Sequence, residues 1–158
     1  MKKILIDLDI CESCRECKAK CSYYYHPNND GVISIREIAT FSIVCRKCEE
    51  GTCVLSCPQD ALERLESGVV KRYNMRCISC KSCSFACPFG TIYPEVIPYL
   101  VSNCDYCLDR LDKEPLCIRS CPVEGALKFT EVEEDEEKGI YKVTENLYVH
   151  STKFWVRV

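Results

Sequence analysis

The chain has 158 residues and a formal net charge of −3, so nucleic acid is not an expected partner. The length allows one compact domain or two small ones, but five phenylalanines, one tryptophan and two methionines leave little material for a conventional apolar core. The longest apolar window, residues 97–101, is too short to cross a membrane, so we expect no direct membrane insertion.

Three short β segments are predicted before the middle of the chain. Apolar side chains alternate with polar ones over residues 3–10, as in a half-buried strand that leads into the first cysteines. A second short strand is expected over residues 32–38. Residues 61–77 predict a hairpin with its turn at Ser67-Gly68.

All 16 cysteines fall into four groups of four, with none left over. The groups are Cys11, Cys14, Cys17 and Cys21; Cys45, Cys48, Cys53 and Cys57; Cys77, Cys80, Cys83 and Cys87; and Cys104, Cys107, Cys117 and Cys121. The third group reads C-x2-C-x2-C-x3-C-P, a spacing in which three thiolates bind one 4Fe-4S cluster and the fourth binds a second. At four cysteines per cluster, the protein is predicted to bind four 4Fe-4S clusters, which carry out one-electron transfer.

This spacing has a physical reason. Two residues between cysteines let the backbone curl so that successive sulfurs reach one cluster, while NH groups of the loop point at sulfur. The three-residue gap before the fourth cysteine carries the chain away from that cluster. Pro58, Pro88 and Pro122 fix φ just beyond the fourth cysteine of three groups. Because the thiolates repel one another, we expect the cluster-free chain to be largely unfolded.

Two other uses of cysteine fit the sequence less well. A disulfide framework suits small secreted proteins, but residues 1–10 lack the long apolar stretch of a signal peptide, so we expect a cytoplasmic protein. Zinc sites use C-x2-C pairs separated by long gaps, and they do not need a third cysteine two residues further on.

The predicted hairpin joins the second and third groups into one ferredoxin-like unit, residues 41–100. If the first and fourth groups also pair, residues 1–40 and 101–130 form another unit around it. The predicted fold is then α+β, with two bacterial-ferredoxin-like units, one nested in the other, whose cores are iron-sulfur clusters. The alternative pairs the first group with the second and the third with the fourth, but the hairpin argues against it.

In the nested form each cluster takes three cysteines from one group and the last cysteine of the paired group. The predicted ligand sets are Cys11, Cys14 and Cys17 with Cys121; Cys104, Cys107 and Cys117 with Cys21; Cys45, Cys48 and Cys53 with Cys87; and Cys77, Cys80 and Cys83 with Cys57.

Three of the groups resemble a known family. The segments CRKCEEGTCVLSCPQDAL, CISCKSCSFACPFGTI and NCDYCLDRLDKEPLCIRSCPVEGAL are similar to the four-cluster electron-transfer subunits of dimethyl sulfoxide reductase, formate dehydrogenase, hydrogenase, carbon monoxide dehydrogenase and tungsten aldehyde oxidoreductase complexes. The resemblance covers about residues 3–130. It implies nested pairing and a series of clusters between a catalytic subunit and a second redox partner, a subunit or a ferredoxin. Two features depart from the family: Ser22 replaces proline after Cys21, and the segments between groups are short.

We favour a non-catalytic subunit over a free polyferredoxin, because a free carrier has no use for the 28 residues that follow residue 130, beyond the ferredoxin-like units. The chain is as short as the cytoplasmic members, which favours a tungsten or molybdenum pterin enzyme, such as an aldehyde oxidoreductase, as the catalytic partner. A small subunit of a hydrogenase or carbon monoxide dehydrogenase system is the alternative. We predict no catalytic residue, because every predicted cluster already has four cysteines and the chain has no nucleotide-binding glycine motif.

Residues 131–158 are predicted to be a docking tail. Residues 131–139 are strongly acidic, as in a solvated linker, and strand patterns follow over residues 141–149. The tail ends in an apolar segment that would suit a partner surface, formed by Phe154, Trp155, Val156 and Val158.

Other residues are predicted to have supporting roles or none. His26 and His150 are expected on the surface or in loops rather than as ligands, and the three tyrosines at 23–25 are expected to shield a cluster. Basic residues close to the cysteines in sequence either favour the reduced clusters or are simply solvated: Arg15, Lys18, Arg46, Lys47, Arg76, Lys81, Arg110 and Arg119.

Overall fold

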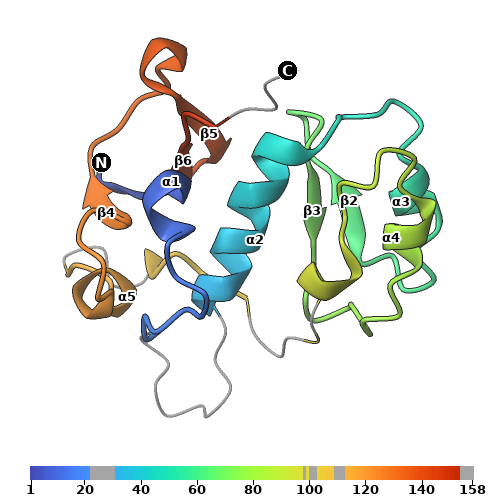
Figure 1. Ribbon diagram of the computed structural model, residues 1–158, viewed down its shortest axis with the longest axis horizontal. Coiled ribbons are helices and arrows are strands. Elements are labelled where there is room, and N and C mark those ends of the chain that lie inside the picture. Colours follow the sequence, from blue (N-terminus) through green and yellow to red (C-terminus); the bar gives the residue numbers. More distant parts are fainter. Residues whose placement is uncertain (22–30, 98, 100–102, 109–112, 154–158) are drawn as a thin grey trace.

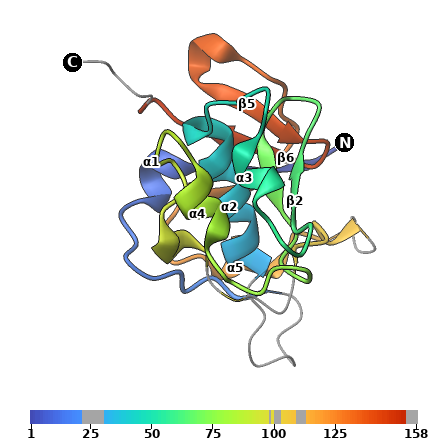
Figure 2. The same cartoon turned by 90° about the vertical axis from the view of Figure 1, so that its right-hand side faces the viewer.

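Two halves joined by a single helix make up the structure, a computed structural model that describes residues 1–21, 31–97, 99, 103–108 and 113–153 (Figure 1). The helix, α2, spans Gly31–Val44. Its buried side chains Val32, Ile35 and Ile38 pack into the core of the first half, whereas Phe41 packs into the core of the second. A view along the long axis places α3 and α4 of the second half in front of α2 (Figure 2).

The first half contains a four-stranded sheet in the order β4-β1-β6-β5. Its strands are β1 (Lys3–Asp7), β4 (Leu127–Thr130), β5 (Ile140–Thr144) and β6 (Leu147–His150). β1 pairs antiparallel with β4 and parallel with β6, so the strand nearest the N-terminus lies in the middle of the sheet. Among the described residues, this half also contains the short helices α1 (Leu8–Cys11) and α5 (Leu116–Ser120) and the 3₁₀ turn η3 (Glu136–Lys138).

Buried apolar side chains at every second position of the two central strands form the core of the first half. Ile4 and Ile6 on β1 and Leu147 and Val149 on β6 are each at most 1% exposed, and they belong to one buried cluster with the apolar residues of α2. Side chains two apart on a strand share a face, so these four residues form one apolar layer between the sheet and the helix. An aliphatic core is therefore present in this half.

The second half is built on a hairpin and two short helices. β2 (Leu62–Arg64) pairs antiparallel with β3 (Val70–Arg72), and the Gly68 NH donates to the Leu65 carbonyl at 2.8 Å, which confirms the predicted turn. The helices α3 (Thr52–Leu55) and α4 (Ser82–Ala86) pack against each other, and the 3₁₀ turn η1 spans Pro94–Val96. Sheet and helices together confirm an α+β fold.

Two predicted strands are wrong in extent or type. The strand predicted over residues 3–10 ends at Asp7, because the Asp7 carboxylate accepts the Ile10 NH at 3.1 Å and caps α1. Residues 32–38 belong to α2. Their β-branched residues favour strands locally, but burial at 32, 35, 38 and 39 follows helical spacing against the sheet.

Part of the predicted docking tail belongs to the sheet of the first half. β6 lies between β1 and β5, and Leu147 and Val149 are fully buried in the first half. These two side chains are therefore covered by the chain's own sheet and helix, and docking through residues 131–158 stays a prediction. The acidic segment before them is exposed as predicted, with no buried residue in η3, whereas residues 154–158 lie outside the described part. No helix among the described residues is long and apolar enough to cross a membrane.

Candidate iron-sulfur cluster sites

Three cavities are each lined by four cysteines. The Cys45 cavity is lined by Cys45, Cys48, Cys53 and Cys87. The Cys77 cavity is lined by Cys57, Cys77, Cys80 and Cys83. The Cys11 cavity is lined by Cys11, Cys14, Cys17 and Cys121. Each cavity therefore combines three cysteines from one sequence group with the last cysteine of another.

The remaining four cysteines, the Cys104 group, are Cys21, Cys104, Cys107 and Cys117. Burial raises the pKa of the Cys104 thiol to about 12, and the nearby Cys117 and Cys21 add to the rise. Burial also raises the pKa of Cys117 to about 12, with further contributions from Cys107 and Cys21. Cys21 thus lies close to cysteines that follow it by more than 80 residues in the sequence.

Short helices carry the chain from one cavity to the next in the second half. α3 contains Cys53, which lines the Cys45 cavity, and ends two residues before Cys57, which lines the Cys77 cavity. α4 makes the reverse crossing, from Cys83 to Cys87. The Thr52 hydroxyl donates to the Ala86 carbonyl at 2.9 Å, which fixes the two crossings side by side.

A left-handed residue shapes the loop between the first two cysteines in three of the groups. Lys47, Ser79 and Tyr106 have φ values of 54°, 57° and 58°, and each directly precedes a cysteine. In two of these loops the NH then turns back to the first sulfur: Ser79 donates to Cys77 Sγ at 3.4 Å, and Tyr106 donates to Cys104 Sγ at 3.3 Å. These loops have the backbone curl and the sulfur-directed NH groups that a cluster-binding loop requires.

Thiols within a cavity oppose one another's ionisation. Burial raises the pKa of Cys53 to about 11, and Cys45 and Cys87, which line the same cavity, raise it further. Burial also raises the pKa of Cys11, and Cys17, Cys14 and Cys121 raise it further. Four thiolates this close need a multivalent cation to offset their charge, and the all-sulfur donor set fits a soft metal such as iron in a 4Fe-4S cluster.

Basic side chains line each of the three cavities. Lys18 lines the Cys11 cavity, Arg46 the Cys45 cavity and Lys81 the Cys77 cavity, and all three are close to cysteines in the sequence as well. Two more were not predicted from the sequence: Arg36 on α2, which lines the Cys11 cavity, and Arg72 on β3, which lines the Cys77 cavity. For Arg72 a signal was present, because it is two residues from buried Val70 and so shares its inward face. Tyr23, Tyr24, Tyr25, His26 and Arg110 lie outside the described residues.

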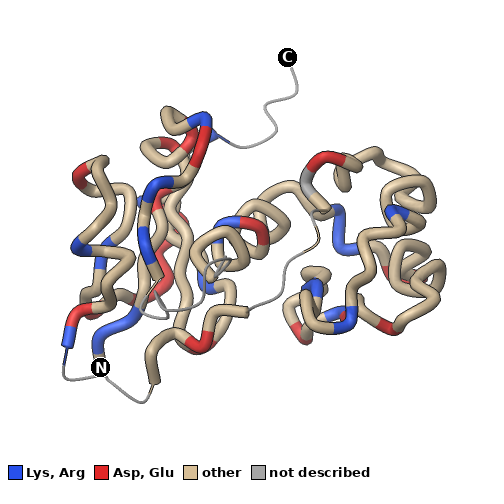
Figure 3. The backbone as a smooth tube through the Cα atoms, turned by 90° about the horizontal axis from the view of Figure 1, so that it is seen from below, with Lys and Arg blue, Asp and Glu red and all other residues tan. Residues whose placement is uncertain are grey.

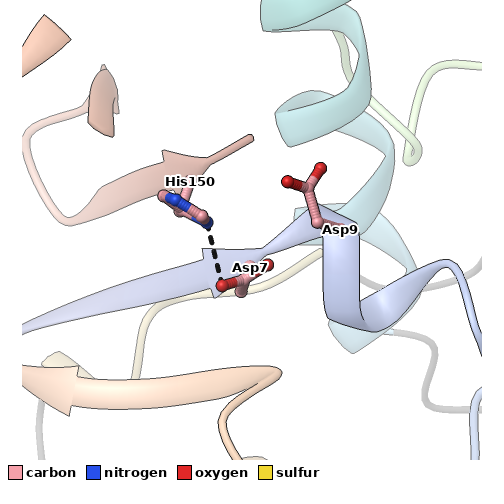
Figure 4. Close-up of side chains that lie close together, drawn as sticks. All are labelled: Asp7, Asp9 and His150. Carbon is pink, nitrogen blue, oxygen red and sulfur yellow. Dashed lines mark ion pairs between the residues drawn. The ribbon is translucent and has the colours of Figure 1, made fainter. Parts of the chain in front are cut away.

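His150 is not in a loop but in β6, where its side chain is 24% exposed. Its Nδ1 atom lies 2.9 Å from Oδ2 of Asp7 on the neighbouring strand β1 (Figure 4). Asp9, also nearby, accepts hydrogen bonds from the Thr152 NH at 2.8 Å and from the Ser151 hydroxyl at 3.0 Å. These contacts fasten the end of β6 to β1 and α1, which is a structural role.

Charged residues of both signs are interspersed over the two halves (Figure 3).

Residues 36–132, more than half of the chain, match the protein family described as the 4Fe-4S dicluster domain. This protein belongs to the 4Fe-4S dicluster family.

Relatives of this dicluster protein carry names from electron transport. It is 35% identical to YsaA of Escherichia coli, a protein named for electron transport, over 82% of this sequence and 90% of that one. It is 30% identical to one component of the anaerobic dimethyl sulfoxide reductase of Escherichia coli, over 84% of this sequence and 75% of that component. Identity to the electron transport protein HydN of Escherichia coli is also 30%, over 78% of this sequence and 85% of that one.

Proposed function

We propose that this dicluster protein is a non-catalytic electron-transfer subunit that binds four 4Fe-4S clusters and connects a catalytic oxidoreductase subunit to a second redox partner. The observation that carries the proposal is the use of every cysteine: all 16 fall into four sets of four, three of which line one cavity each. When bound, such clusters supply one-electron transfer. Electron transport in the names of YsaA and HydN supports the same function.

In this proposal the cysteines are the ligands, in the four sets that line the cavities or lie together in the Cys104 group. Apolar side chains such as Ile92, Val70 and Ala126 line the cavities beside them and would exclude water. Loop NH groups directed at Cys77 and Cys104 would offset the negative charge of the sulfur atoms. These roles are all those of a scaffold that holds and insulates redox centres.

The second half carries a surface suited to a redox partner. Leu55 on α3, Phe85 on α4 and Phe89 just after α4 are 78%, 85% and 59% exposed. We call these three residues the apolar end. Large apolar side chains gathered on two contacting helices are typical of protein interfaces. Phe89 also lines the Cys45 cavity, so a partner covering the apolar end would approach the cluster proposed there.

The catalytic partner we favour is a tungsten or molybdenum pterin enzyme such as an aldehyde oxidoreductase. The small subunit of a hydrogenase or carbon monoxide dehydrogenase system is the alternative. The dimethyl sulfoxide reductase component and a sulfite dehydrogenase component from Allochromatium vinosum, which is also 30% identical, are relatives whose names place them in oxidoreductase complexes.

Iron and sulfide analysis of the anaerobically purified protein tests the proposal. With four irons in each of four clusters, we expect about sixteen iron and about sixteen acid-labile sulfide per chain. An iron count near eight would reduce the proposal to two clusters, and zinc without sulfide would overturn it. Identification of the co-purifying protein, with analysis for tungsten, molybdenum and nickel, would then distinguish the partner classes.

A further inference from the structure

A buried ion pair joins the two halves of the molecule. Arg72, the last residue of β3, has a side chain that is 1% exposed, and Glu37 on α2 has one that is 8% exposed. The Arg72 Nε donates to Glu37 Oε1 at 2.6 Å, and Nη2 donates to Oε2, so the contact is bidentate. Removing two charges from water is costly, and a pair that only joined α2 to β3 could be replaced by apolar side chains.

The arginine of this pair also reaches a predicted cluster ligand. Arg72 lines the Cys77 cavity, and its guanidinium hydrogen-bonds the Cys77 sulfur. An arginine guanidinium keeps its positive charge throughout the pH range in which proteins fold. A fixed positive charge therefore lies against one sulfur of this cavity.

Both residues of the pair also line a cavity that one cysteine of the Cys104 group lines. A cavity of about 170 Å³ is lined by Glu37 and Arg72 together with Cys104 and Tyr106 from the first half. Arg72 therefore lines one cavity with Cys77 of the second half and another with Cys104 of the first half.

We propose that Arg72 and Glu37 are positioning residues that set the reduction potential of the cluster bound in the Cys77 cavity, with Arg72 raising the potential and Glu37 limiting the rise. The proposal rests on the proposed function, because it requires a cluster in that cavity. Reduction adds one negative charge to a cluster, and a nearby guanidinium stabilises that charge strongly where water is excluded. The Glu37 carboxylate opposes this effect by offsetting the guanidinium charge.

An EPR-monitored redox titration of the intact holoprotein tests the proposal, because substitutions of Arg72 and of Glu37 should shift the reduction potential in opposite directions. We expect Glu37→Gln to raise the ratio of reduced to oxidised cluster at a fixed potential about tenfold or more, which is about 59 mV for a one-electron couple. Arg72→Gln should lower the ratio by a similar factor. The affected signal should be the one that Cys80→Ser, in a ligand of the same cavity, also changes.

Two further variants separate charge from structure. Arg72→Lys keeps the charge but loses the bidentate contact, and we expect it to restore most of the potential lost in Arg72→Gln. Arg76→Gln is the matched control, because Arg76 directly precedes Cys77 but is exposed, so solvent screens its charge and the ratio should change less than threefold.

The outcomes distinguish this inference from the proposed function. Variants that hold the same iron as the unchanged protein but show no shift, or shifts of the same sign, would overturn the inference and leave the function standing. A shift in Arg72→Lys as large as in Arg72→Gln would also overturn it, because the charge would then have no effect. If Arg72→Gln does not fold, Glu37→Gln and Arg72→Lys decide the matter. Unchanged protein without iron would instead defeat the proposed function.

Discussion

In the first half, the fourth cysteine of each sequence group lies beside the first three cysteines of the other group. Cys121 lines a cavity with Cys11, whereas Cys21 lies with the Cys104 group. The Lys20 NH donates to the Ser120 hydroxyl at 2.8 Å, so the residues that precede the two exchanged cysteines are in contact. Each fourth cysteine is therefore held beside three cysteines about 100 residues away in the sequence.

Replacing Cys121 with serine should perturb the cluster in the Cys11 cavity and leave the signal of the Cys104 group unchanged. Serine binds iron less well than cysteine, so we expect this cluster to lose between about one and four irons, measured by iron analysis and EPR. Cys21→Ser is the matched control, and it should perturb the Cys104 group instead. If Cys121→Ser altered the same signal as Cys107→Ser, the exchange would be wrong.

Residues whose contacts are local are the ones that the sequence predicts well. The cysteine spacing predicts the curled loops, because Lys47 and Ser79 need only their own neighbours to place the next sulfur. In the second half, the hairpin at Ser67-Gly68 was visible in the sequence, and the two cavities there are lined by cysteines of the second and third groups; the ligand sets themselves stay a prediction. Arg36 was missed because its contact with the cysteines depends on how α2 packs, which no local spacing encodes. Strand alternation could have placed Arg72 on the inward face of β3, but not beside Cys77, because that contact depends on how β3 packs.

β6 is the element on which the first half depends. It pairs with β1 on one side and β5 on the other, and its inward residues are fully buried. Its strand character was predicted, but its role was not, because an alternating pattern is the same whether a strand pairs with its own chain or with a partner. The helix over residues 31–44 was missed for a related reason: its seven-residue start resembles a strand until the packing on the sheet is known.

Removing residues 140–158 should destroy the cluster sites of the first half while sparing those of the second. Without β5 and β6, the apolar layer of β1 and α2 is exposed, and the Cys11 cavity, which Ile6 helps to line, loses its support. We expect about half of the iron to be lost per chain. Removing only residues 154–158 is the matched control, and unchanged iron after both truncations would refute the prediction.

At the scale of the whole molecule, α3 and α4 lie toward one end of the long axis and the sheet of the first half toward the other (Figure 1). The Cys45 and Cys77 cavities belong to one half, and the Cys11 cavity to the other. A series of clusters across α2 would therefore present one terminus at each end, and the apolar end offers one docking surface.

Substituting Leu55 and Phe85 together by glutamate should weaken binding of the co-purifying partner by about 100-fold or more without loss of iron. Both side chains are exposed, so the change spares the folded chain but places charge in an apolar interface. Titration calorimetry with the isolated partner measures the loss. Ile33→Glu, at an exposed position on α2 in the first half, is the control and should bind normally. Equal affinity for all three proteins would exclude the apolar end as the docking surface.

The placement of β6 also bears on how the protein is made. Residues 45–97, which contain all the cysteines of the second half, leave the ribosome before Cys104, Cys117 and β6 are synthesised. The first half can close only when β6 reaches β1, across about 140 residues of chain. Cysteines that emerge first, Cys11 to Cys21, must therefore stay reduced and unpaired until the last strand arrives. Insertion of iron should begin in the middle of the polypeptide and finish at its two ends, which makes the early cysteines the ones most in need of anaerobic surroundings during biosynthesis.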